Sequence, residues 1–226
     1  INVVEAQRLA RTLLTTYLGR QTSERVLAGE ITRGQGERIR AAVWFCDLRG
    51  YTAMMAALGS FPMIDVMNRY FDCMAEAVWS EGGEILKFMG DAMLVVFRLT
   101  DDRDAPTVAR SAVRAAQLAL KNLAVLSESR VQRGEIPLEA GVSVHIGHVV
   151  YGNIGASTRL DFTVMGHSVN LVARIQGLAG DTNESLLVSA EVAEHLGDDV
   201  ESIGFYLLKG ISDPVEVFRL SGSVES

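Results

Sequence analysis

The sequence has 226 residues, of which 48% are hydrophobic and 22% charged, and it carries a formal net charge of −7. These values are typical of a globular protein long enough for one domain with a sizeable core. The acidic balance and the absence of a basic run exclude a nucleic-acid groove, because such grooves neutralise phosphates with clustered Lys and Arg.

The two cysteines, Cys46 and Cys73, are too few and too unpatterned for a disulfide framework, which favours a reducing, cytoplasmic location. No run of roughly 18 apolar residues and no signal peptide occurs. We therefore expect no membrane contact by this segment. The first residue, Ile1, is not Met, so we expect a piece of a longer protein whose upstream regulatory domain is out of view.

The N-terminal part, residues 1–39, is predicted to be a helical segment followed by a linker. Leu9 and Leu13 belong to a helix-like apolar stripe, and a glycine-containing stretch without periodicity follows it. Residues 40–226 are predicted to form the main domain.

The main domain opens with a strand pattern at 41–46 that ends at Asp47. Apolar residues from Phe61 to Val78 then recur at three- and four-residue intervals, which predicts an amphipathic helix. Gly82 and Gly83 would end that helix.

The remaining elements alternate strand patterns with helices. Strands are predicted at 85–88, 93–97, 138–146, 161–165, 203–208 and 215–220, and helices from Asp104 to Leu126 and from Ser168 to Leu178. Gly90 and Asp91 would form the hairpin turn between the first two of these strands. This mixture predicts an α+β fold whose helices cover one face of a sheet.

Asp47 and Asp91 each lie next to a hydrophobic strand and near a glycine. Either could be an ordinary turn aspartate, since Asp favours turns. If the two strands are neighbours, however, both carboxylates meet at one edge of the sheet. They could then hold magnesium, which prefers a few carboxylates together with phosphate oxygens and water.

Asn170 and Arg174 lie four residues apart on a predicted helix and therefore share one face. They could be plain surface residues, but the apolar residues around them indicate a buried or interfacial border, where an Arg favours phosphate or carboxylate. No GxxxxGK[ST] motif is present, which excludes a P-loop. His145 and His148 would point to opposite faces of a strand and are interpreted as structural.

Four segments in one order resemble the catalytic domain of class III adenylate and guanylate cyclases. They are WFCDLRGYTAM (44–54), ILKFMGDAMLVVF (85–97), HIGHVVYGNIG (145–155) and LDFTVMGHSVNLVARI (160–175), and the likeness runs from about Tyr17 to Leu220. The resemblance implies a ferredoxin-like class III cyclase fold, with a central, mostly antiparallel sheet and helices packed on it.

The resemblance also implies roles for the polar residues already singled out. Asp47 and Asp91 would bind two divalent metal ions, magnesium or manganese. Asn170 would orient the ribose, and Arg174 would stabilise charge on the α-phosphate.

Further positions match the family's base-reading and phosphate-binding residues. Lys87 and Thr163 correspond to the pair that reads the purine, and this combination places the chain with the Lys/Thr adenylate cyclases. Lys209 resembles a basic residue that meets the terminal phosphates. Asp161 is, by register, not a base reader, and His167 stands where many relatives have aspartate.

The implied activity is conversion of ATP to 3′,5′-cyclic AMP and pyrophosphate by a homodimer. In the family, the metal aspartates belong to one subunit and the base-reading and Asn/Arg residues to the other. The alternatives are a guanylate cyclase, which Lys87 and Thr163 disfavour, and a catalytically weak regulatory homologue. A diguanylate cyclase would need a GGDEF-type turn, whereas Gly82 and Gly83 lie at a predicted helix end.

Overall fold

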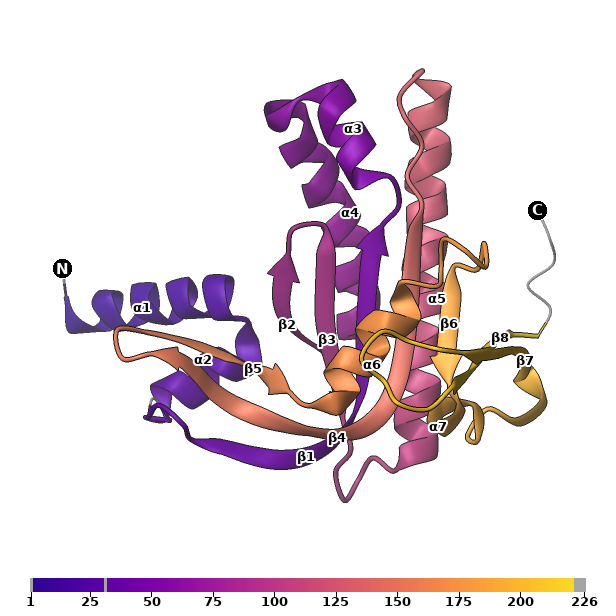
Figure 1. Cartoon of the computed structure of the whole chain (residues 1–226). Coiled ribbons are helices and arrows are strands. Elements are labelled where there is room, and N and C mark those ends of the chain that lie inside the picture. Colours follow the sequence, from indigo (N-terminus) through magenta and orange to yellow (C-terminus); the bar gives the residue numbers. More distant parts are fainter. Residues whose placement is uncertain (1, 31, 222–226) are drawn as a thin grey trace.

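The computed structural model describes residues 2–30 and 32–221, and within them a single eight-stranded sheet organises the chain (Figure 1). The strands are β1 (Gly36–Leu48), β2 (Glu84–Met89), β3 (Ala92–Arg98), β4 (Ala140–Ala156), β5 (Arg159–Met165), β6 (Leu186–Ser189), β7 (Val200–Tyr206) and β8 (Val215–Leu220). The helices are α1 (Val3–Leu18), α2 (Arg20–Leu27), α3 (Tyr51–Leu58), α4 (Ser60–Ser80), α5 (Ala105–Gln132), α6 (His167–Gln176), α7 (Ala190–Ala193) and the 3-10 turn η1 (Gly197–Asp199).

The sheet has the order β2-β3-β1-β4-β6-β8-β7, and β5 pairs with β4 off this path. Every pairing is antiparallel except that of β4 with β6. The predicted α+β class with a mostly antiparallel sheet is therefore confirmed. β1 lies at the centre between β3 and β4, and it starts at Gly36, so it crosses the boundary predicted between residues 39 and 40.

The two faces of β1 lie in different parts of the core. Ala42, Trp44 and Cys46 face the large cluster formed with α4 and α5, whereas Ala41 and Val43 face a second cluster that includes Val172 of α6. The long helices thus cover one face, and α6 packs on the opposite one (Figure 1). The prediction that helices cover a single face holds for α4 and α5 but not for α6.

The long helices form where the sequence predicts them. Met63, Val66, Tyr70 and Met74 of α4 are buried at three- and four-residue spacing. Asp104 caps α5, accepting a hydrogen bond of 2.9 Å from the backbone N–H of Thr107. The sequence predicts these helices because apolar residues recur at helical spacing over many turns.

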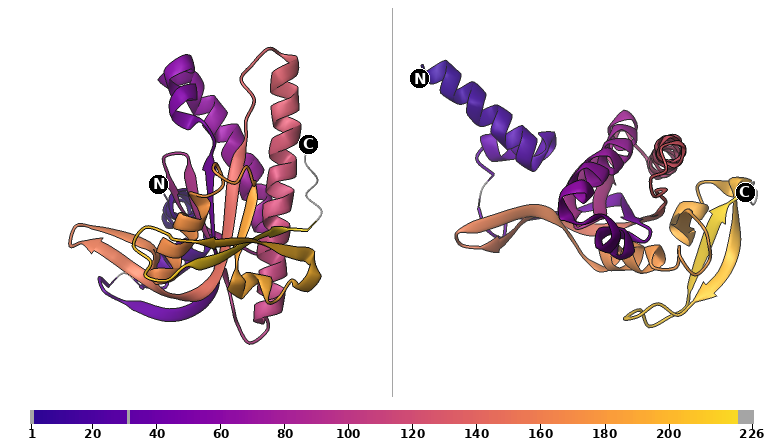
Figure 2. Two further views of the ribbon diagram at one scale, coloured as in Figure 1. Left: turned by 45° about the vertical axis from the view of Figure 1, so that its right-hand side comes forward. Right: turned by 90° about the horizontal axis from the view of Figure 1, so that it is seen from above.

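The glycine-rich stretch after residue 146 continues as strand rather than turning. A Cβ on Gly147 would lie 2.1 Å from Oγ of Ser168, and one on Gly152 would lie 2.3 Å from the carbonyl oxygen of Gln35. Glycine is therefore needed at both positions for close approach within the chain. The ends of β1, β4 and β5 (residues 36–40 and 148–165) form an arm that extends beyond the rest of the sheet (Figures 1 and 2).

The N-terminal residues form two helices that meet at Gly19, where φ is 78°. α1 has no buried residue and projects from the body (Figure 2). α2 is anchored instead, because the Arg25 guanidinium lies 4.9 Å from the centre of the Tyr151 ring and donates a 2.7 Å hydrogen bond to Glu37.

Tyr151, in the arm, is at the centre of a partly buried polar cluster. Its hydroxyl is 2.8 and 2.7 Å from the two carboxylate oxygens of Glu84. Arg98 stacks on the ring at 4.9 Å and, like Arg25, donates to Glu37. Burial raises the pKa of Glu84 although the Tyr151 hydroxyl stabilises its charge. The cluster thus joins α2 to the first residue of β2.

We predict that Tyr151→Phe lowers the free energy of unfolding by roughly 1–3 kcal/mol, because the buried Glu84 carboxylate loses its principal donor. Urea denaturation followed by circular dichroism measures this change. Tyr17→Phe, at an exposed position on α1, is the control and should leave the midpoint unchanged. Equal midpoints for Tyr151→Phe and the unmodified chain would contradict the assigned role of the hydroxyl.

Candidate active site

The register of β1 against β3 brings Asp47 and Asp91 together. Cys46 lies opposite Met93, so Asp47, the next residue along β1, reaches the turn that joins β2 to β3. That turn contains Gly90, whose φ of 67° favours glycine, followed by Asp91. The predicted meeting of two carboxylates at one sheet edge is therefore what the structure shows.

The two carboxylates repel each other in a half-buried position. Burial first, and then the hydrogen bond and charge of Asp91, raise the pKa of Asp47 to about 7. Oδ1 of Asp47 is buried and lacks a hydrogen-bond partner among the described residues. Paired carboxylates of this kind gain from a cation.

The donor set fits magnesium or manganese rather than zinc. Both side chains offer only oxygen, which hard cations prefer. In residues 2–30 and 32–221, no third His, Cys, Asp or Glu joins them in a metal-binding cluster. Two carboxylates leave further coordination positions for phosphate oxygens and water.

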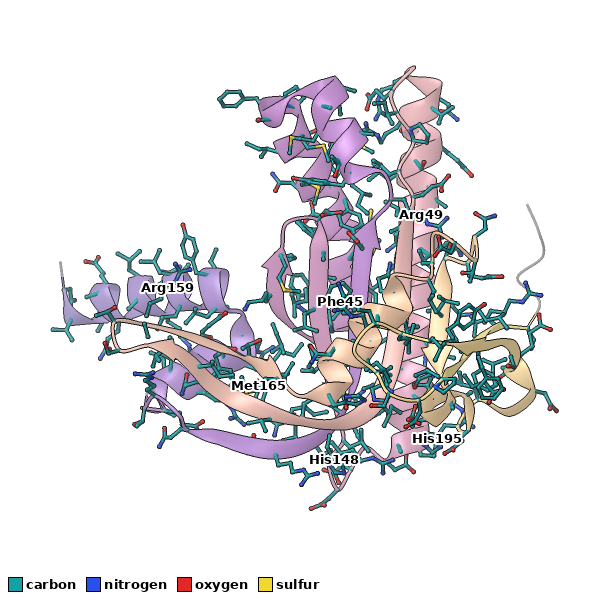
Figure 3. The ribbon with its side chains drawn as sticks, viewed as in Figure 1. Phe45, Arg49, His148, Arg159, Met165 and His195 are labelled. Carbon is teal, nitrogen blue, oxygen red and sulfur yellow. The ribbon has the colours of Figure 1, made fainter. Side chains whose placement is uncertain are left out.

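Arg49 fixes the segment that follows Asp47. Its Nη2 donates to the carbonyl oxygens of Ala179 and Glu184 at 2.9 and 2.7 Å, and its backbone N–H donates to the carbonyl oxygen of Glu139 at 2.8 Å. In Figure 3, Arg49 lies above the sheet between the end of β1 and the chain that follows α6. Sequence reasoning missed this residue, since its side-chain hydrogen bonds reach residues 130 and 135 positions away in the chain.

Asn170 and Arg174 lie on the exposed side of α6, while Val172 and Ile175 face the core. In the part of the chain that the structure describes, neither polar side chain takes part in a hydrogen bond or ion pair. The same is true of Lys209, which is exposed in the loop after β7. Within the described part of one chain, the three side chains predicted to bind the phosphates and the ribose thus have no polar partner.

Lys87 and Thr163 come from strands that are not paired, β2 and β5. Lys87 Nζ forms a 2.5 Å ion pair with Oδ2 of Asp161, two residues before Thr163. Because side chains alternate along a strand, Asp161 and Thr163 share one side of β5. Sequence reasoning set Asp161 aside, and only its two-residue spacing from Thr163 could have signalled the contact.

The two histidines of β4 have separate environments, as predicted. His145 is buried, with Nδ1 2.9 Å from Oγ of Ser189 and 3.2 Å from Glu191, whereas His148 is exposed (Figure 3). They do not face a common ligand.

Comparison with known proteins adds to this geometry. The family model described as "Adenylate and Guanylate cyclase catalytic domain" matches residues 36–222. The chain belongs to this family. The resemblance seen in the sequence is thereby confirmed, while membership of the Lys/Thr subgroup stays a prediction.

Individual relatives include both kinds of cyclase. An adenylate cyclase of Anabaena cylindrica is 32% identical over 163 residues, covering 72% of this chain and 32% of that protein. The crystal structure of the adenylyl cyclase CyaB from P. aeruginosa is 30% identical, with a TM-score of 0.75 over 84% of this chain and 97% of that one. The guanylyl cyclase Cya2 is also 30% identical, with a TM-score of 0.71 over 83% and 94%.

The chain spans about a third of the length of the curated relatives it matches. Across the described ranges, no helix is long and apolar enough to cross a membrane. Because one adenylyl and one guanylyl cyclase structure are each 30% identical to this chain, we argue the choice of purine from the chain's own residues.

The carboxylate pair predicts a pH effect on stability when metal is absent. The unfolded pKa of Asp is about 3.9, and that of Asp47 in the folded chain is about 7. A raised folded pKa means that stability present below pH 4 is lost as pH rises through 7. Asp47→Asn lacks this titrating group. In EDTA, we therefore expect its free energy of unfolding, relative to that of the unmodified chain, to rise by roughly 1–2 kcal/mol from pH 5 to pH 8.

Denaturant titrations of both chains at pH 5 and pH 8 measure this difference. Subtracting the value of the unmodified chain at each pH cancels the contribution of the other titrating groups. Asp65→Asn, at an exposed position on α4, serves as the control and should show no such change. A stability difference for Asp47→Asn that is constant with pH would contradict the strained carboxylate pair.

Proposed function

We propose that this domain is an adenylate cyclase that converts ATP to 3′,5′-cyclic AMP and pyrophosphate. The observation that carries the choice of ATP is the placement of Lys87 against the side of β5 that bears Thr163. A lysine ammonium donates hydrogen bonds only. It matches the acceptor N1 of adenine, whereas guanine presents an N–H there. The threonine hydroxyl can accept from the exocyclic amine of adenine.

Asp47 and Asp91 would hold two divalent ions, magnesium or manganese, through their carboxylate oxygens. Such ions, when bound, supply positive charge that favours ionisation of the 3′ hydroxyl and neutralises the phosphates. Asn170 would orient the ribose so that the 3′ oxygen attacks the α-phosphorus in line. Arg174 would stabilise charge that develops on the α-phosphate, and Lys209 would bind the terminal phosphates. No side chain acts as a nucleophile.

The complete site is proposed to form between two copies of the chain. Supporting this, Asn170, Arg174 and Lys209 are exposed and unpaired within the described part of one chain. Exposed apolar side chains also flank the proposed ligands. Phe88 and Met89 precede the Asp91 turn, and Phe205 and Leu207 precede Lys209. A two-fold dimer would cover such surfaces and create two equivalent sites.

The ATP substrate and the two free cysteines support a reducing, ATP-containing location, which we propose is the cytoplasm.

The shared site predicts complementation between inactive chains. Asp47→Ala and Arg174→Ala should each abolish cyclic AMP formation. When the two variants are co-expressed with different tags, about half of the dimers should be mixed. Each mixed dimer has one intact site, so activity should return to roughly a quarter of the unmodified level. Product formation from ATP with magnesium or manganese, followed by chromatography, measures this recovery.

Co-expression of Asp47→Ala with Asp91→Ala is the matched control. Both changes damage the same half of the site, so their mixed dimers should stay inactive. Verified Asp47→Ala and Arg174→Ala mixed dimers that are as inactive as their parents would rule out a site shared in this way.

The proposed base readers predict a change of substrate. Lys87→Glu combined with Thr163→Cys should lower kcat/KM for ATP and shift preference toward GTP, because the donor and acceptor set no longer matches adenine. Competition assays with both nucleotides measure the ratio. Lys121→Glu, on the exposed side of α5, makes the same charge change elsewhere and is the control, which should leave the ratio unaltered. If the double variant also leaves the ratio unaltered, the assignment of Lys87 and Thr163 as base readers is refuted.

A further inference from the structure

The ion pair between Lys87 and Asp161 connects two strands that share no backbone hydrogen bonds. β2 is at one end of the sheet order, and among the described residues β5 pairs only with β4. Both side chains are partly open to solvent, with 31% of Lys87 and 53% of Asp161 exposed. An ion pair this exposed contributes little to stability, roughly 0–1 kcal/mol. Its main effect is therefore to fix where the Lys87 ammonium lies.

An irregularity in β2 directs Lys87 toward Asp161. Ile85 lies opposite Val95, but Lys87 lies opposite Leu94, so Leu86 is one extra residue in β2. In a regular strand, Lys87 would share the face of Ile85, which packs on the core beneath α4 and α5.

The bulge instead places Lys87 on the face of Leu94, whose cluster includes Phe162 of β5. Phe88, the next residue, packs its ring against that of Phe71 of α4, with the ring centroids 4.5 Å apart, so the regular alternation resumes at once. A bulge that turns a single side chain is a recognised device beside functional sites. Here its result is that Lys87 faces β5.

We propose that Asp161 is a positioning residue for purine recognition, which holds Lys87 in the orientation that selects adenine over guanine. This inference rests on the proposed function, in which Lys87 and Thr163 read the base. Base selection then depends on three side chains rather than two.

The ion pair restricts the conformational freedom of the Lys87 side chain. A lysine side chain carries about 2 kcal/mol of rotamer entropy. Ordering it before the nucleotide arrives reduces the cost of binding. The ammonium has three hydrogens, and one bond to Asp161 leaves two for the base. ATP can therefore bind without breaking the ion pair.

Orientation also decides discrimination between the purines. A mobile ammonium could move to the O6 acceptor of guanine, whereas one held by Asp161 meets the N1 position, which accepts in adenine and donates in guanine. Loss of Asp161 should therefore weaken ATP binding and reduce the preference for ATP.

The test is a double-mutant cycle with Asp161→Asn, Lys87→Met and both changes together, with kinetics measured on ATP and GTP. Asp161→Asn should raise KM for ATP by about tenfold, change kcat by less than about twofold, and lower the ATP to GTP ratio of kcat/KM. In the Lys87→Met background, Asp161→Asn should have no further effect. Asp161→Glu, which keeps the charge, should restore part of the loss.

Asp65→Asn is the matched control, because Asp65 forms a comparable exposed ion pair with Arg69 at 2.9 Å. It should leave KM and the substrate ratio unchanged. Thermal unfolding midpoints within about 2 °C of each other would separate a positioning role from a structural one.

Each contrary outcome has a distinct meaning. If Lys87→Met alone leaves the substrate ratio unchanged, the base-reading part of the proposed function fails and this inference fails with it. If Lys87→Met shifts the ratio but Asp161→Asn does not, only the inference about Asp161 is overturned. A lower KM for ATP in Asp161→Asn would also overturn it, since Asp161 would then compete with adenine for Lys87.

Discussion

The antiparallel pairing of β1 with β3 in one register is the constraint on which the candidate site depends. It places Asp47 beside the turn that carries Asp91. A slip of one residue would separate these carboxylates and would also turn Trp44 and Cys46 away from the core formed with α4 and α5. The hydrophobic pattern of β1 therefore fixes the position of the polar groups at its end.

Packing of the same core offsets an unfavourable free energy at the candidate site. Two like-charged carboxylates lie together, and one buried oxygen of Asp47 lacks a partner among the residues described, an arrangement that is unfavourable until a cation neutralises it. Burial of large side chains such as Trp44 and Tyr70 offsets that cost. On the other face, α6 presents Asn170 and Arg174 outward, where we propose that they complete the site of a second chain.

The sequence was informative where the patterns are long and regular. α4, α5 and the hairpin of β2 and β3 follow from apolar periodicity, an Asp N-cap and a Gly-Asp turn. β6 was not predicted, because four buried residues show no alternation. The length of β4 was underestimated, since the predicted strand stops at residue 146, whereas β4 continues through Gly147 and Gly152, where close packing requires glycine. The contact between Lys87 and Asp161 depends on a bulge and on unpaired strands, which no local pattern reveals. The roles of Asn170, Arg174 and Lys209 depend on a second chain and a nucleotide, so they stay predictions.

The most direct test of the central claim is anomalous diffraction from crystals grown with Mn²⁺ and an ATP analogue that cannot cyclise. We expect anomalous peaks for Mn²⁺ ions bound by both Asp47 and Asp91 of one chain. They should lie next to the phosphates of a nucleotide whose base is at Lys87 and Thr163 of a second chain. A bound nucleotide with its Mn²⁺ away from these carboxylates, or with all its contacts to one chain, would contradict the account.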